Sequence, residues 1–382
     1  MVDTRAHRAK LLFVLSNDYG ELATAMYLLL GSEFRPVLLM PDRLFAANGN
    51  SLPFAAHRYA SLREVTETID REQPDIVFLF SGYLYAANNI FDVETTEALV
   101  RDLRSRHHRI VTSDPFLGLM SEIGAQTFSD RHPRKQWLTE HFSRLSRVFA
   151  DVTHLYLINT QAFARTQSVS FFNGHIILPV SAFAECERKL SGWMRLAAGR
   201  KRWVCVLSLE DYGAQVKRHG RARFDDLLIN TLQQIARAGR QPILVAPEAC
   251  LASIQGTGPS IDGLVLLPFC GYDLFEALLL EAEYVFYWNI FSNSILARAI
   301  NHLPVFFFDP GHMAHAIPAL YDLGMKRYYP GAALSYLDQR LKLNPAELAV
   351  LAADQEHTLR EARENFGRSP TPEEMVEKIL QR

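Results

Sequence analysis

The sequence predicts an α/β protein with two tandem domains, each a doubly wound parallel sheet, facing each other across a cleft. Three observations lead to this prediction. Short apolar runs alternate with helical segments, the alternation stops over 181–201 and then restarts, and the phrase VLSNDYG at 14–20 returns as VLSLEDYG at 206–213. Each copy of the phrase ends an apolar run. We therefore interpret both as acidic loops at strand tips, one on each side of the cleft.

The first series of elements predicts an N-terminal Rossmann-like domain over 1–180. Its helices alternate with apolar runs of strand length, as βαβ units require. The predicted helices are 21–30, 61–72 and 93–106, and the predicted strands are 10–15, 35–40, 75–80, 109–112, 154–158 and 175–179.

The second series predicts a C-terminal Rossmann-like domain over 203–355, after a polar linker at 181–202. The predicted strands are 203–208, 242–246, 263–267, 284–287 and 305–308, and the predicted helices are 224–238, 273–281 and 292–301. After Pro330 the sequence is helical in pattern, and the C-terminal helices at 356–382 include PTPEEMVEKILQ, which is suited to a helix start. We expect these last helices to return towards the N-terminal domain.

Composition argues against nucleic-acid binding, a membrane span and a metal site. A formal net charge of −2 argues against a nucleic-acid binder, and 48 % hydrophobic residues allow a sizeable core. The apolar stretch LLFVL is far too short for a membrane span, so we expect no transmembrane segment and a cytoplasmic protein. No D-x-D pair ends a predicted strand. The four cysteines, Cys186, Cys205, Cys250 and Cys270, lack metal-ligand spacing, so no metal site is predicted. The oligomeric state stays open.

The stretch Leu266–Asp309 resembles the nucleotide-sugar-binding domain of GT-B glycosyltransferases. A loop at 268–272 leads to a helix ending at 282–283, then a short strand, a polar turn at 289–294, a second helix and a strand after Pro304. The resemblance implies a nucleoside-diphosphate sugar as donor, bound by the C-terminal domain. It also implies an acceptor on the N-terminal side and no required cofactor. The sequence departs from the family where an acidic ribose-binding residue is usual, because Ala297 stands there.

The donor-side candidates follow from this placement. The stretch NIFSNS precedes good helix formers, and a helix start presents N–H groups and positive dipole to a diphosphate. Its candidates are Asn289, Ser292, Asn293 and Ser294, although a well-capped helix would look the same. The second DYG phrase offers Ser208, Tyr212 and Gly213, followed by Arg218 between Lys217 and Arg221. These cations suit a leaving diphosphate, or an exposed basic helix start.

Two further groups complete the donor side. Phe269 and Tyr272 border a loop where a nucleotide base would stack, or where aromatic rings simply pack. Asp309 and His312 follow a strand at the same sheet edge, where the resemblance implies contact with the donor sugar or its β-phosphate. A turn made by Pro310 and Gly311 is the competing interpretation.

On the acceptor side, Asp18 is the predicted general base that takes a proton from the attacking hydroxyl. Its neighbours Asn17, Tyr19 and Glu21 are acceptor-side candidates, as is Asp114 after another strand. Asp18 could equally cap a helix, and Asp114 could start a turn. Asp211, on the donor wall, is interpreted as a loop or capping residue.

The leading functional hypothesis is a glycosyltransferase that moves a sugar from a nucleoside-diphosphate donor to an unidentified acceptor. A nucleotide-sugar epimerase or a phosphotransferase of the same fold is the alternative enzyme. A catalytically silent GT-B-like protein that binds a nucleotide or assists an enzyme is the third possibility, and Ala297 favours it.

Overall fold

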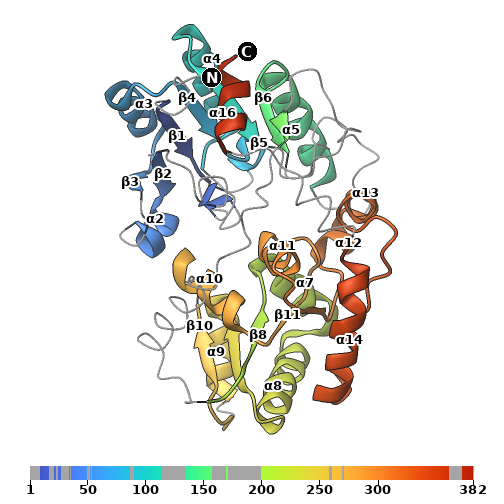
Figure 1. Ribbon diagram of the computed structural model, residues 1–382. Coiled ribbons are helices and arrows are strands. Elements are labelled where there is room, and N and C mark those ends of the chain that lie inside the picture. The colour runs from blue at the N-terminus through green and yellow to red at the C-terminus, as the bar shows by residue number, and fades with distance from the viewer. Residues whose placement is uncertain are drawn as a thin grey trace. The chain divides into compact units, whose positions relative to one another are not determined.

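The computed structural model describes most of the 382-residue chain. The described residues are 9–16, 21–22, 25–26, 34, 36–49, 52, 54–86, 90–113, 134–156, 169–170, 199–257, 260–268, 271–360 and 372–381. The chain divides into two compact units, each built on a parallel sheet (Figure 1). The first unit holds Met1–Ile176, Ala316–Tyr328 and Glu364–Arg382, and the second holds Ile177–His315 and Tyr329–Arg363.

The sheet of the first unit has the strand order β3-β2-β1-β4-β5-β6-β7, with every pair parallel. The strands are β1 (Leu11–Val14), β2 (Val37–Pro41), β3 (Ala55–Tyr59), β4 (Ile76–Leu79), β5 (Arg109–Ser113), β6 (Thr153–Tyr156) and β7 (Val169–Ser170). β1 is entirely buried in the middle of the sheet, and its Phe13 ring stacks on Phe78 of β4 at 4.3 Å.

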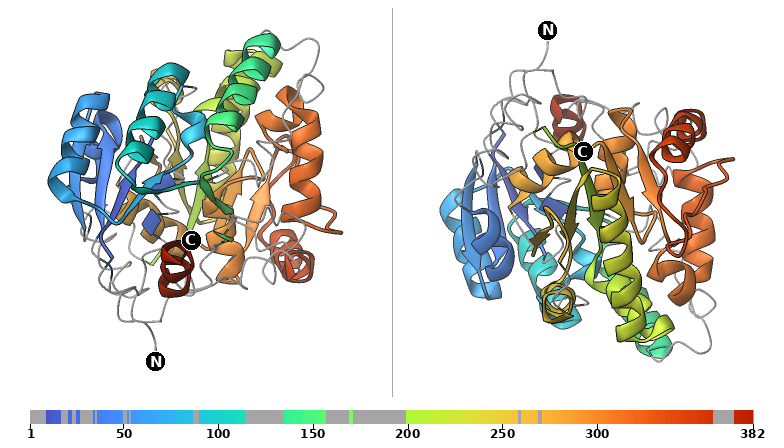
Figure 2. Two further views of the ribbon diagram at one scale, coloured as in Figure 1. Left: turned by 90° about the horizontal axis from the view of Figure 1, so that it is seen from above. Right: turned by 90° about the horizontal axis from the view of Figure 1, so that it is seen from below.

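Right-handed crossovers place three helices of the first unit on one face of its sheet. They are α3 (Leu62–Glu72), α4 (Val93–Ser105) and α5 (Lys135–Val148), which lie in a row in Figure 2. The shorter α2 (Asp42–Asn48) and η2 (Gly82–Leu84) follow β2 and β4. Ser61 and Glu64 form a reciprocal capping box at the start of α3. It provides acceptors for backbone N–H groups that have no partner within the helix.

The end of the chain belongs to this first unit. In Figure 1, α16 (Pro372–Leu380) lies in it beside strands of the N-terminal half. Arg109 of β5 donates to the Leu380 carbonyl at 3.1 Å, and Val376 is completely buried. α13 (Pro318–Tyr328) is also assigned to this unit.

The second unit has the strand order β10-β9-β8-β11-β12, again parallel throughout. Its strands are β8 (Arg202–Val206), β9 (Gln241–Val245), β10 (Val265–Leu267), β11 (Tyr284–Tyr287) and β12 (Val305–Phe307). Its helices are α7 (Leu209–His219), α8 (Arg221–Arg237), α9 (Glu248–Thr257), α10 (Tyr272–Glu281), α11 (Asn293–Ile300), α12 (His312–Ala316) and α14 (Pro345–Thr358).

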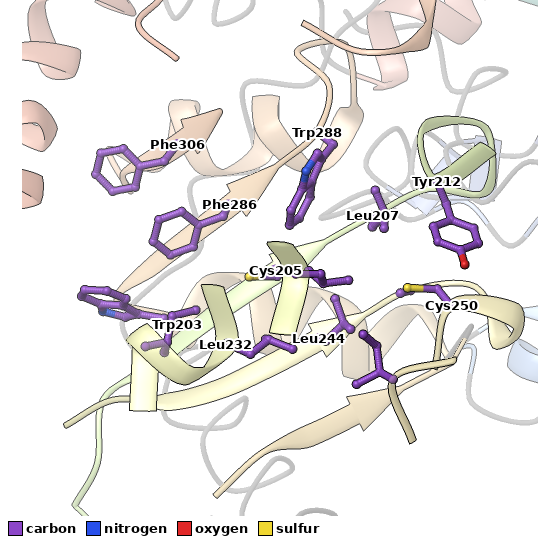
Figure 3. Packing of buried hydrophobic residues seen from close by; sticks show 14 of the residues in the cluster. Trp203, Cys205, Leu207, Tyr212, Leu232, Leu244, Cys250, Phe286, Trp288 and Phe306 are labelled. Carbon is purple, nitrogen blue, oxygen red and sulfur yellow. The ribbon is translucent and has the colours of Figure 1, made fainter. Parts of the chain in front are cut away.

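Aromatic side chains dominate the core on one face of this second sheet. Figure 3 shows Trp203, Phe286 and Phe306 in a row across β8, β11 and β12. The Phe286 ring stacks on Phe306 at 5.5 Å, and Trp288 lies edge-on to Phe224 of α8. Burial of such large apolar surfaces supplies the main driving force that holds α8 against the sheet.

Arg298 of α11 is completely buried, although no carboxylate neutralises it among the hydrogen-bond partners that the structure gives it. Its guanidinium donates to four backbone carbonyls, those of Leu279, Ala282, Glu283 and Pro304. Burial lowers the pKa of Arg298 to about 10, which leaves it charged at neutral pH. Arg298 therefore ties the end of α10 to the starts of β11 and β12.

Most predicted strands coincide with observed ones, but several elements differ from the prediction. The prediction has no strand at β3 or β7, and it names no helix at α2, α5, α7, α9, α12 or α13. α14 lies in the region after Pro330 that is predicted to be helical. The predicted strand at 175–179 and most of the linker at 181–202 lie outside the described residues, and the domain boundaries stay predictions. Of the predicted helix at 21–30, residues 21–22 and 25–26 are described, and they are helical.

The prediction of a loop at the second DYG phrase is wrong. Ser208 caps α7, and Asp211, Tyr212 and Gly213 lie inside its first turns. The Ser208 hydroxyl accepts the Asp211 N–H, which satisfies a donor at the helix start and lets the helix begin directly after β8. Among the described residues, no helix is long and apolar enough to cross a membrane.

We expect Arg298→Leu to lower the free energy of unfolding of the second unit by at least about 3 kcal/mol. Each buried carbonyl left without a donor costs about 1–3 kcal/mol. Chemical denaturation followed by tryptophan fluorescence measures this, because Trp203 and Trp288 are both buried in that unit. Arg340→Leu is the control. Arg340 is exposed and paired only locally with Asp338, so its midpoint should match that of the wild type. An unchanged midpoint for Arg298→Leu would contradict the structural role.

Candidate functional site

The carboxyl ends of β8, β11 and β12 meet at one edge of the second sheet, because these strands are neighbours in it. Ligands of open parallel sheets bind beyond such strand ends. Polar residues follow each of the three strands at this edge. They are Ser208 and Asp211 after β8, Asn289 after β11, and Asp309 and His312 after β12.

Asp211 joins these three segments through one carboxylate that is 1 % exposed. Its Oδ2 accepts a hydrogen bond from the Ser208 hydroxyl at 2.7 Å and one from Asn289 Nδ2 at 2.7 Å. Its Oδ1 accepts the backbone N–H of His312 at 3.0 Å and lies 2.9 Å from His312 Nδ1. Four donors from three segments thus converge on one buried side chain.

The contact between Asp211 and His312 lowers the pKa of Asp211 and raises the pKa of His312. Burial alone would raise the pKa of Asp211, but its hydrogen bonds from His312 and Ser208 outweigh burial and lower it. Burial alone would lower the pKa of His312, but the hydrogen bond and charge of Asp211, aided by Glu210, raise it. Asp211 is therefore ionised at neutral pH, and His312 holds its proton more tightly than an ordinary histidine.

Gly311 allows the loop after β12 to reach Asp211. Its φ is +99°, a conformation that other residues rarely adopt. A Cβ on Gly311 would lie 2.8 Å from Asn289 Cβ and 3.0 Å from Asn289 Cα. Only glycine therefore permits the close approach that brings the N–H and the ring of His312 to the carboxylate.

A second polar group lies at the same edge. Arg218, at the end of α7, forms an ion pair with Asp309 and also contacts Nε2 of His315. Asp309 is buried and accepts the Gly311 N–H at 2.9 Å. Burial and the charge of Arg218 lower the pKa of His315, so its neutral ring can accept a hydrogen bond from Arg218. The Arg218 side chain itself is about one-third exposed.

The start of α11 contributes hydroxyl groups beside this edge. Ser292 is the N-cap residue, and its side chain does not cap the helix. Instead its hydroxyl lies 2.8 Å from that of Ser294, which is 6 % exposed. Asn293 is the first helical residue and is partly exposed. As predicted, a helix begins here, with its N-terminus at the carboxyl edge of the sheet.

Two predicted donor residues, Tyr212 and Gly213, lie in the first turns of α7 and have other roles. The Tyr212 ring packs in the core, 6.0 Å from Phe224, and points towards Cys250 in Figure 3. Gly213 lies in α7, and a side chain there would meet open space, so no tight turn needs it. Tyr272 begins α10, and Phe269 lies outside the described residues.

The acceptor-side candidates are less fully described. Asn17, Asp18, Tyr19 and Asp114 lie outside the described residues, so their roles stay predictions. Glu21 is buried, and its carboxylate accepts the backbone N–H and the hydroxyl of Ser16 at 2.6 and 2.8 Å. That pairing fixes the chain at the end of β1, which leaves little of the carboxylate for an acceptor.

Asp211 is the residue that the sequence interpretation undervalued. A signal was present, since Ser208 and Asp211 stand three residues apart after an apolar strand, the spacing of a capping box. The sequence could not reveal that Asn289 and His312 also reach this carboxylate. Among the described residues, no group of three or more His, Cys, Asp or Glu side chains could hold a metal ion.

No protein-family model matches the sequence, and no curated protein matches it either. Solved structures do match in fold. UDP-GlcNAc 2-epimerase from Methanocaldococcus jannaschii superposes with a TM-score of 0.52 at 12 % identity, over 98 % of this chain and 99 % of that one. The chain has a GT-B-like fold.

Two further structures extend the comparison. The same archaeal enzyme in complex with UDP-GlcNAc and UDP gives a TM-score of 0.50 at 12 % identity, again over 98 % of this chain and 99 % of that one. MurG from Acinetobacter baumannii gives a lower TM-score of 0.44 at 12 % identity, over 98 % of this chain and all of that one. At such identities the GT-B likeness is one of fold, and function has to be argued from the site.

We expect Gly311→Ala to destabilise the second unit by about 1–3 kcal/mol, because a Cβ at this φ clashes with Asn289. Gly213→Ala is the matched control. It adds the same methyl group to a helix with open space, and should stabilise the protein by about 0.5–1 kcal/mol. Thermal unfolding of both variants measures the contrast. Equal effects would contradict the close approach at Gly311.

The Asp211–His312 pair should make stability depend on pH. The lowered pKa of Asp211 contributes stability above its unfolded value of about 4, and the raised pKa of His312 contributes below its unfolded value of about 6.5. The wild type should therefore exceed His312→Gln most between about pH 4 and 6.5. The gap should shrink as the pH rises through the pKa of folded His312. Urea denaturation at pH 5.5 and 8.5 tests this, and a gap that widens at pH 8.5 would contradict the pair.

Proposed function

We propose that this chain binds a nucleoside-diphosphate sugar at the carboxyl edge of its second sheet and transfers the sugar to an acceptor. One observation carries the proposal: Arg218 and the start of α11 both lie at this edge. A cation and a helix N-terminus both favour a bound diphosphate. A matching fold that has been crystallised with UDP-GlcNAc and UDP supports the same class of ligand.

Sugar transfer demands stabilisation of the departing diphosphate. Negative charge builds on its oxygens as the bond to the sugar breaks, and fixed positive groups lower that barrier. Arg218 is oriented by Asp309 and His315 before any ligand arrives, so little conformational freedom is lost on binding. Ser292 and Asn293 offer further donors at the helix start.

Recognition of the ribose must differ from the pattern of the GT-B family. Ala297 stands at the position of the usual acidic residue and is completely buried within α11. It offers no polar group, so the ribose hydroxyls would need other partners. Asp18, which the sequence predicts as a base on the acceptor side, lies outside the described residues.

Epimerisation of a nucleotide sugar is the second candidate function. It is favoured by the fold matches of highest TM-score among those reported above, which are epimerase structures. The two reactions differ in a simple way, because an epimerase needs no acceptor. Incubation with UDP-GlcNAc alone, followed by NMR, would reveal an epimerised sugar nucleotide in one case and only released UDP in the other. A silent protein would bind the nucleotide and change nothing.

We expect Arg218→Gln to weaken UDP binding by about 10- to 100-fold, since a charge-assisted hydrogen bond contributes about 1.5–3 kcal/mol. Isothermal titration calorimetry with UDP measures the change. Arg237→Gln is the matched control, because Arg237 is exposed in the last turn of α8, directly before β9 and hence at the opposite edge of the sheet. Equal affinity for UDP in Arg218→Gln and the wild type would remove the diphosphate from this edge.

A further inference from the structure

One ring nitrogen of His312 contacts Asp211, and the other is directed away from that contact. Nδ1 lies 2.9 Å from Asp211, and the His312 backbone N–H is bound to the same carboxylate oxygen. Nε2 makes no hydrogen bond to any residue that the structure describes. The side chain is 37 % exposed, whereas its carboxylate partner is 1 % exposed. A buried carboxylate thus orients a ring whose second nitrogen can reach a ligand.

The geometry points to a proton-transfer pair, in which His312 accepts a proton from the substrate through Nε2 and Asp211 positions it. This inference rests on the proposed sugar transfer and assigns its general base to the second unit. A histidine in this setting has a fixed tautomer, because Asp211 retains the proton on Nδ1 and leaves the lone pair on Nε2.

The attacking hydroxyl oxygen, from an acceptor or from water, forms a bond to the anomeric carbon while the bond from that carbon to the diphosphate oxygen breaks. The hydroxyl proton moves to Nε2 of His312, and the electron pair of the broken bond stays on the diphosphate. The imidazolium that results is stabilised by the ionised Asp211, which itself takes no proton.

Charged groups around His312 favour proton uptake. Asp211 and Glu210 of α7 act on it directly and raise its pKa. At the same edge, Arg218 of α7 is paired with Asp309, and His315 of α12 lies 3.9 Å from Asp309. The base works only when deprotonated. The rate should therefore rise as the pH increases through the pKa of His312, which lies above the ordinary value of histidine.

The test follows UDP release from UDP-GlcNAc, with water as acceptor, in the wild type and four variants across pH 5–9: His312→Gln, Asp211→Asn, His302→Gln and Asp18→Asn. His312→Gln should lower the rate by at least about 100-fold and leave UDP affinity nearly unchanged. Asp211→Asn should lower the rate and move the midpoint of the pH profile to lower pH, because the charge that raises the pKa of His312 is gone. NMR titration of labelled histidines should show the same displacement. His302→Gln is the control, since His302 pairs with Glu356 on the exposed surface and should retain the full rate.

These measurements distinguish a wrong assignment of the base from a wrong class of ligand. Full UDP release by His312→Gln, in a protein that binds UDP, overturns the role of His312 alone. An unchanged pH midpoint in folded Asp211→Asn overturns the positioning role of Asp211. A rate lost in Asp18→Asn but retained in His312→Gln assigns the base to the N-terminal side instead. A wild type that binds no UDP contradicts the proposed function itself.

Discussion

One buried carboxylate organises the carboxyl edge of the second sheet. Asp211 is ionised and almost fully excluded from water, a state that is tolerated only when every oxygen is well partnered. Its donors come from three segments that follow three neighbouring strands. The position of each segment therefore depends on the same charge. Loss of one donor would leave part of a buried anion uncompensated.

A second buried charge, Arg298, connects segments at the opposite edge of the same sheet. Arg298 gathers carbonyls from the end of α10 and from the starts of β11 and β12. Its partners are backbone groups, so it contributes to the architecture and presents nothing to a ligand. β11 and β12 are thus fixed by a guanidinium at their amino ends and by a carboxylate network at their carboxyl ends. Rigidity at both ends allows a small set of side chains at the carboxyl edge to be held in a defined geometry.

The GT-B-like fold alone leaves the chemistry open, because one fold can host unrelated functions. The details of the site are more informative. An arginine paired with Asp309 and a histidine paired with Asp211 lie at the carboxyl edge where we propose the diphosphate. Ala297, at the position that the GT-B resemblance gives to an acidic ribose contact, is a buried methyl group.

The sequence by itself determined the two parallel sheets, since buried strands such as β1 and β11 are continuous apolar runs between helical segments. The prediction lacks β3, because AAHRY is only partly buried and is not a continuous apolar run. It also places a loop at the start of α7, because Asp211-Tyr212-Gly213 has turn composition, whereas the cap at Ser208 favours a helix. Candidates such as Asn289, Asp309 and His312 could be proposed from their places after strands. The contact of Asn289 and His312 with one carboxylate could not, because they lie 78 and 101 residues from Asp211 along the chain. Only the pairing of β8 with β11 and of β11 with β12 brings those distant positions to one edge, where a single carboxylate connects them.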